Sequence, residues 1–198
     1  MALFLCAAAS DAYALTARET AEQEAQKILS MLNDPAFKDE ATRPAVKQKI
    51  EKEIVGLFDF EEFSTRTVGQ HWKKFTPQQK EGFKSAFTDL IRNTYIDTLD
   101  EYNGQQVQFT GERSSNNGTR VEVQMNFVAG QQTYPVAFRM LQKNNAWVVY
   151  DVIIEGISMI KNYRDQFRDI LVKSSPDELI KRVQEKAEEQ KNKKPGKK

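Results

Sequence analysis

Asp151, Glu155 and His71 are the side chains whose types could support acid–base chemistry. Asp151 lies within the apolar segment 147–154 and Glu155 directly follows it. A carboxylate in such surroundings must be paired, hydrogen-bonded or directed at a cavity. Either one could act as the general base of an enzyme for a small apolar substrate. A structural hydrogen bond is the commoner use of a carboxylate there, so the enzyme is kept as the alternative hypothesis.

Other motifs for catalysis or cofactor binding are missing from the sequence. His71 is the only histidine, Cys6 is the only cysteine, and no Gly-x-Ser-x-Gly segment occurs. The usual hydrolytic triads and zinc ligand sets therefore lack their residues. The nine glycines are dispersed, without a phosphate-binding glycine motif. We expect no catalytic residue, no metal and no cofactor, with His71 at the surface.

Composition indicates one globular domain. The chain has 198 residues, of which 39% are hydrophobic and 29% charged, as in ordinary folded proteins. A formal net charge of +1 argues against a nucleic-acid partner. Beyond the first residues, no apolar stretch approaches the ~20 residues that cross a bilayer.

The N-terminus has the pattern of an export signal. Residues 2–9 are apolar, and Ala12-Tyr13-Ala14 has the small-x-small form of a signal-peptidase site. We predict a signal peptide over residues 1–14, although no basic residue precedes the apolar run and the true translation start stays open. A buried N-terminal helix or strand is the alternative. Lipidation at Cys6 is disfavoured because Leu5 occupies the position of a small residue, and cleavage would leave a mature chain without thiols.

The first half of the mature chain has the periodicity of helices. The clearest start signal is Thr76-Pro77-Gln78-Gln79, a capping threonine followed by proline and a glutamine. Apolar residues at helical spacing predict amphipathic helices over residues 16–32, 44–58, 60–68, 77–102 and 157–171, with a last one from 176. The lysine-rich end, residues 191–198, is predicted to be a disordered basic tail after a single domain spanning 15–190.

From Gln105 the apolar period changes from 3.6 to 2. Alternation around Val107, over 121–127 and over 134–140 predicts three strands, and the segment 147–154, apolar on both faces, predicts a fourth that is central or lies under a helix layer. Turn residues at 115–118, 130–131 and 144–145 separate the four strands. Short connections imply an antiparallel meander, with Gly156 at its end. The predicted fold class is therefore α+β, an antiparallel sheet of about four strands wrapped by helices.

Several segments resemble a known family. The stretch YDVIIEGISMI at 150–160 with NYRDQF at 162–167, the segment GQHWKKFTPQQK at 69–80 and YNGQ at 102–105 are similar to the MlaC/toluene-tolerance family. The resemblance covers essentially the whole mature chain, and the segment from 150 is its most specific part.

The resemblance implies a non-enzymatic periplasmic phospholipid carrier. Members of the family shuttle lipid between the outer and inner membranes and maintain lipid asymmetry. It also implies a nuclear-transport-factor-2-like cone with a deep apolar pocket for the acyl tails. The implied partners are an inner-membrane Mla ABC transporter complex and an outer-membrane lipoprotein complex, with phospholipid as cargo rather than cofactor.

A carrier must hide about 30 tail methylenes, each worth about 0.8 kcal/mol, in a pocket on the order of 900 Å³. Each candidate for the wall is also a candidate for ordinary core, and a structural adaptor with a solid core is a further alternative. The candidate lipid-binding residues are Phe87, Leu90, Ile91, Tyr95, Val123, Met125, Phe127, Val136, Phe138, Met140, Trp147, Val149, Ile157 and Ile160.

Overall fold

The structure is a computed structural model that describes residues 15–115 and 117–193. The predicted signal peptide and the last residues of the predicted basic tail lie outside this part of the chain. Within it, no helix combines the length and the hydropathy that a membrane crossing requires.

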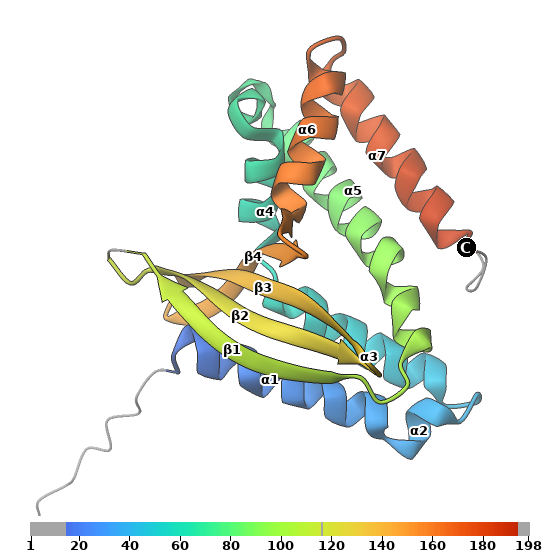
Figure 1. Cartoon of the computed structure of the whole chain (residues 1–198). Coiled ribbons are helices and arrows are strands. Elements are labelled where there is room, and N and C mark those ends of the chain that lie inside the picture. Colours follow the sequence, from blue (N-terminus) through green and yellow to red (C-terminus); the bar gives the residue numbers. More distant parts are fainter. Residues whose placement is uncertain (1–14, 116, 194–198) are drawn as a thin grey trace, which may run out of the picture.

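Helices make up both ends of the described chain (Figure 1). The start signal at Thr76 is confirmed: its side chain accepts a hydrogen bond from Gln79 N, and the Gln79 side chain accepts one from Thr76 N, which closes a capping box. The helices are α1 Ala17–Asn33, α2 Pro35–Lys38, α3 Arg43–Leu57, α4 Phe60–Val68, α5 Pro77–Tyr95, α6 Met159–Leu171 and α7 Pro176–Lys191, with 3₁₀ helices η1 Gly69–Lys74 and η2 Ile96–Glu101.

The long helix predicted up to residue 102 is shorter than expected. Regular α-helix ends at Tyr95, and the chain continues as the tighter η2. Lys47 of α3 fixes η2 by ion pairs to Asp97 (2.8 Å) and Asp100 (2.7 Å). This attachment holds η2 against α3. At the other end of the described chain α7 continues to Lys191.

The sheet is an antiparallel meander, as the sequence predicts, with one additional short strand. Its strands are β1 Gln106–Ser114, β2 Arg120–Ala129, β3 Gln132–Lys143, β4 Ala146–Ile154 and β5 Ile157–Ser158, paired in chain order. Asn144 and Asn145 both have positive φ, 51° and 62°, which gives the tight hairpin turn that suits the sheet twist. Gly156 turns the chain instead of ending the sheet, because β5 pairs back onto β4.

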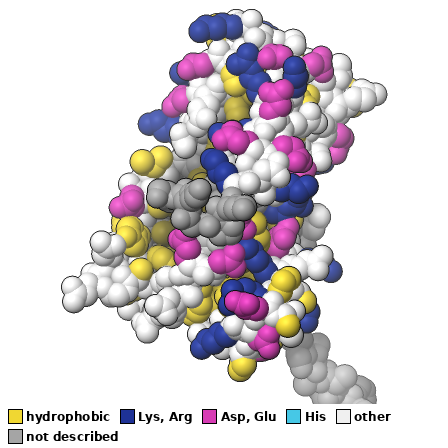
Figure 2. Space-filling view, turned by 90° about the vertical axis from the view of Figure 1, so that its right-hand side faces the viewer, with side chains coloured by type: hydrophobic (Ala, Val, Ile, Leu, Met, Phe, Trp, Pro, Cys, Tyr) yellow, Lys and Arg dark blue, Asp and Glu magenta, His cyan; other side chains and the backbone are white. Residues whose placement is uncertain are grey.

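The residues that alternate along β2 and β3 share one face of the sheet. Val123 lies opposite Phe138 and Met125 opposite Val136, so their side chains project to the same side. Helix α1 runs along β1 and β2, whereas α4, α5, α6 and α7 form a separate helical group above the sheet in Figure 1. Figure 2 shows hydrophobic side chains gathered on the left of this face at mid-height, with charged side chains spread over both its upper and its lower part.

The most tightly packed region is an aromatic cluster inside the helical group. Phe63 of α4, Phe83 and Phe87 of α5 and Phe167 of α6 are all buried. The Phe87 ring lies 5.1 Å from that of Phe63 and 5.4 Å from that of Phe167, measured between centroids, within the range of favourable aromatic pairs. This cluster joins three helices into a rigid layer.

Asp151 of β4 joins the sheet to this layer. Its side chain is 1% exposed and accepts hydrogen bonds from Ser158 Oγ (2.7 Å), the backbone N–H of Ile160 (3.0 Å) and the Arg139 guanidinium (3.2 Å). The carboxylate therefore sits at the N-terminus of α6, where the orphan N–H groups and the helix dipole favour a negative charge.

Asp151→Ala should lower the free energy of unfolding by roughly 3 kcal/mol, because it removes a buried carboxylate from three donors and leaves the Ser158 hydroxyl and the buried Ile160 N–H without this acceptor. Urea unfolding followed by circular dichroism measures this change. Glu185→Ala, at an exposed position of α7, is the control and should change stability by less than about 0.5 kcal/mol. Equal effects of the two substitutions would contradict the anchoring role of Asp151.

Candidate functional site

The larger apolar cavity lies between α1, α3 and the sheet, and is called here the α1 cavity. Its volume is about 340 Å³, which is larger than the ~150 Å³ apolar cavity that accommodates benzene in another protein. Its walls are α1 residues such as Ala25 and Ile28, residues of α3 and η2, and the sheet residues Val107, Met125, Phe127, Phe138, Met140 and Val149.

The α1 cavity contains one carboxylate. Glu24 of α1 lines the wall, and its Oε2 atom is buried without a hydrogen bond, 3.9 Å from Lys27 Nζ. Lys27 in turn pairs with Glu53 of α3 at 2.5 Å. These charges lie across the seam between α1 and α3, so the cavity interior stays apolar except at this seam.

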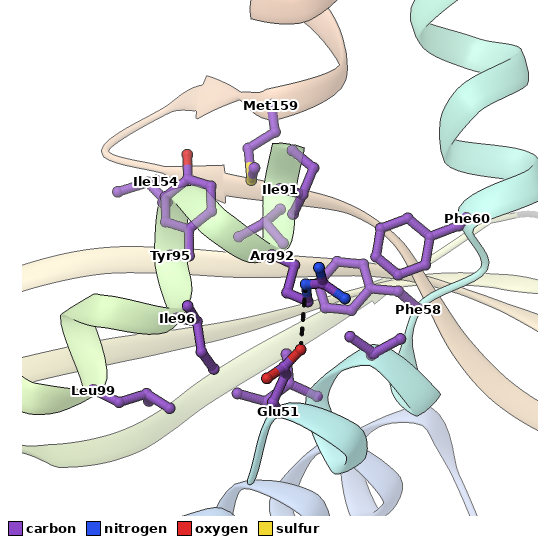
Figure 3. Close-up of a pocket in the computed structure, with 13 residues that line it drawn as sticks. Glu51, Phe58, Phe60, Ile91, Arg92, Tyr95, Ile96, Leu99, Ile154 and Met159 are labelled. Atoms are coloured by element: carbon purple, nitrogen blue, oxygen red, sulfur yellow. Dashed lines mark ion pairs between the residues drawn. The ribbon is translucent and has the colours of Figure 1, made fainter. Parts of the chain in front are cut away.

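A second, smaller cavity lies between α3, α5, η2 and the end of β4, and is called the α5 cavity. Its volume on the same measure is about 180 Å³. Figure 3 shows Phe58 and Phe60 on one side of it, with Ile91 and Tyr95 across from them and Met159 at its upper end. Its only charged wall residues among the described part of the chain are Glu51 and Arg92, which pair with each other at 3.3 Å.

Three side chains belong to both cavities: Ile54, Phe58 and Leu99. Phe58 is held from its backbone, since it forms a bridge with Val149 of β4 and Asp59 N donates to Val149 O at 2.8 Å. The two cavities are therefore neighbouring chambers with a thin partition of side chains between them.

Half of the sequence-predicted pocket residues line these chambers. Ile91 and Tyr95 line the α5 cavity, and Met125, Phe127, Phe138, Met140 and Val149 line the α1 cavity. The other half lie outside both walls. Phe87, Leu90, Val123 and Ile160 are buried in solid core, Val136 packs against it, Trp147 donates from Nε1 to Leu15 O, and Ile157 is 64% exposed.

For the two α5 residues that lie outside both cavities, Phe87 and Leu90, the structure shows the physical cause. The apolar stripe of α5 is continuous, but its middle part packs against other helices: the Phe87 ring contacts Phe63 of α4 and Phe167 of α6, and Leu90 lies in the same buried cluster. Only the C-terminal end of the stripe, at Ile91 and Tyr95, reaches a cavity. Periodicity identifies a buried face without telling whether a helix or an empty space lies opposite it.

Sequence reasoning missed the contribution of α1 and α3 to the walls. Ala25, Ile28, Leu29, Ile54 and Leu57 all line the α1 cavity. Several of them stand on the apolar stripes that predict these two helices, so the signal was present. The sequence contains no indication that the apolar stripes of α1 and α3 face the same side of the sheet.

The carboxylates of the enzyme hypothesis lie away from both cavities. Asp151 is saturated by its three donors, and Glu155 is an exposed turn residue with φ of +50°. Among the described residues, no group of three His, Cys, Asp or Glu side chains is placed to hold a metal ion. Neither carboxylate lines the α1 cavity or the α5 cavity.

The described structure is an α+β protein with two adjoining apolar chambers. The family model of the MlaC protein matches residues 22–185. The chain belongs to the MlaC family, as the motifs at 69–80 and 150–167 indicate.

Similar proteins agree with this assignment. The intermembrane phospholipid transport system binding protein MlaC of Haemophilus influenzae is 23% identical over 188 residues, covering 89% of this chain and 88% of its own. The toluene tolerance protein ttg2D of Pseudomonas putida is 30% identical over 106 residues, 53% of this chain and 49% of its own.

One solved structure shares the fold. It is the phospholipid-binding protein of Ralstonia solanacearum in complex with a phospholipid, with a TM-score of 0.78 and 23% identity, covering 89% of this chain and 99% of that one. The predicted fold class is thereby confirmed.

Tyrosine ionisation should report on the packing beside the α5 cavity. Burial raises the pKa of Tyr163, and the neighbouring Tyr95 phenol adds to the rise. The unfolded chain then releases this proton first, near pH 10, so stability is full below about pH 10 and falls as the pH rises above it.

Tyr163→Phe should therefore lose less stability than the unmodified protein between about pH 9.5 and 11. Urea midpoints across this range measure the difference, and Tyr134→Phe in β3 is the control. Parallel declines for the unmodified protein and Tyr163→Phe would contradict the prediction.

Proposed function

We propose that this protein is a periplasmic phospholipid carrier that holds acyl tails in the α1 and α5 cavities. The family membership supports it, as do a relative named for intermembrane phospholipid transport and a neighbour solved with a bound phospholipid. The single observation that carries the proposal is the pair of adjoining chambers with almost wholly apolar walls.

The energetics of the cargo explain why such chambers are needed. Two acyl tails present about 30 methylenes, so exposing them to water costs on the order of 24 kcal/mol. A chamber with apolar walls removes this cost during passage through an aqueous compartment. Because the tails then pass between two apolar surroundings, loading and release are close to balanced, and membrane partners can set the direction.

The proposed route runs between the outer and inner membranes and serves to maintain lipid asymmetry. The partners in it are an outer-membrane lipoprotein complex and an inner-membrane Mla ABC transporter complex. The proposed periplasmic location agrees with the predicted signal peptide and with the absence of thiols after residue 14.

Transfer of this kind requires no covalent step, and we propose that the protein is not an enzyme. The alternative is a small-molecule enzyme with Asp151 or Glu155 as general base, and neither carboxylate is among the residues that line the α1 and α5 cavities. The adaptor alternative requires a solid core between sheet and helices, whereas the α1 cavity occupies that position.

Native mass spectrometry of the gently purified protein tests the proposal directly. The spectrum should show a mass excess equal to one diacyl phospholipid, because an empty apolar chamber costs stability that the lipid restores. A bare chain in every preparation would argue strongly against a carrier.

A cavity-filling substitution provides the second test. Ala25→Trp places an indole inside the α1 cavity and should lower the lipid-bound fraction about tenfold, because it occupies the space of several methylenes. Gln26→Trp, on the exposed side of the same helix, is the matched control and should retain its lipid. Equal retention by both variants would show that the α1 cavity holds no tail.

A further inference from the structure

The α5 cavity has no place for a charged headgroup inside it. Apart from Glu51 and Arg92, its walls are apolar side chains and the Tyr95 ring. Leaving a phosphate among them without hydrogen bonds would cost many kcal/mol. A phospholipid with a tail in this cavity must therefore place its phosphate outside the apolar walls. Glu51 and Arg92 mark the one charged side of the wall, between α3 and α5 (Figure 3).

A polar groove begins at that side. It runs between α3 and α5 and is lined by Gln48, Lys49, Glu51, Lys52, Val55, Thr88 and Arg92. Glu51, Val55 and Arg92 also line the α5 cavity. The apolar chamber thus continues into a polar groove across one shared edge, which is the arrangement that a molecule with an apolar tail and a charged head requires.

Cations predominate in this groove. Lys49 and Lys52 stand one turn apart on α3, so they share a face of the helix. Both are exposed. Neither forms an ion pair within the described part of the chain. Arg92 is bound to Glu51 at 3.3 Å and to Asp89 at 3.1 Å. Three cations therefore face two carboxylates, both of which are already paired with Arg92.

We propose that this groove binds the phosphate of the lipid whose tail occupies the α5 cavity. Lys49 and Lys52 supply unpaired ammonium groups. Arg92, whose Nε and Nη2 atoms pair with Glu51 and Asp89, adds the positive charge of its remaining Nη1 donor at the shared edge. The inference rests on the proposed carrier function and adds to it a preference for phosphate-bearing lipids over neutral lipids with the same tails.

Competitive loading tests the proposal. The full chain is incubated with vesicles of equimolar phosphatidylglycerol and diacylglycerol that carry identical acyl chains, and native mass spectrometry gives the ratio of the two bound lipids. Lys49→Glu/Lys52→Glu should lower the bound ratio of phosphatidylglycerol to diacylglycerol about tenfold, a change of about 1.4 kcal/mol. Arg92→Gln should lower it in the same direction.

The matched control is Lys73→Glu/Lys74→Glu on η1, which makes the same charge change at exposed positions outside both cavities and the groove. Its ratio should equal that of the unmodified protein. An unchanged ratio in Lys49→Glu/Lys52→Glu, with both lipids still loaded, overturns the headgroup site and leaves the carrier function intact. Uptake of neither lipid by the unmodified protein overturns the carrier function and the headgroup site together.

Inorganic phosphate distinguishes a lipid phosphate from a free one. At millimolar concentration it should leave the thermal midpoint of the unmodified protein unchanged, because without tails the groove holds phosphate only weakly. A stabilisation by phosphate that Lys49→Glu/Lys52→Glu removes, together with an unchanged lipid ratio, would assign the groove to free phosphate and overturn the proposal.

Discussion

The packing of Phe83 and Phe87 against the aromatic side chains of α4 and α6 is the interaction on which the cavities depend. An unfilled chamber of about 340 Å³ forgoes on the order of 8 kcal/mol of packing energy. Domains of this size retain only about 5–15 kcal/mol of net stability. The molecule can keep such a chamber because the helical group is packed solidly elsewhere and carries the stability of the fold.

The sequence predicts features with local causes well, but it does not tell whether a buried face packs against other side chains or lines a cavity. Turn residues such as Asn144-Asn145 and the cap at Thr76 have local physical causes, so the helices and the meander were predicted well. The surroundings of a buried face depend on partners distant in sequence. Phe87 and Ile91 stand one turn apart on the same stripe, yet only Ile91 reaches a cavity.

The role of Asp151, a buried polar residue, also depends on partners that the sequence alone does not identify. A carboxylate in an apolar strand indicates either chemistry or a structural bond, and sequence alone leaves the two open. Its partners, Ser158 and the N–H of Ile160, follow it closely in the chain, but they meet it only because the Glu155-Gly156 turn reverses the strand. The same turn brings Asp151 to the N-terminus of α6 and so attaches the sheet to this helix.

The partition formed by Ile54, Phe58 and Leu99 has a kinetic consequence for any ligand with two apolar arms. Each arm can enter its own chamber, so the arms need not be withdrawn in concert. Exposing one arm of about 15 methylenes costs on the order of 12 kcal/mol, half the amount for two. Departure in two steps would then face a lower activation barrier than a single expulsion, with a half-released intermediate between them.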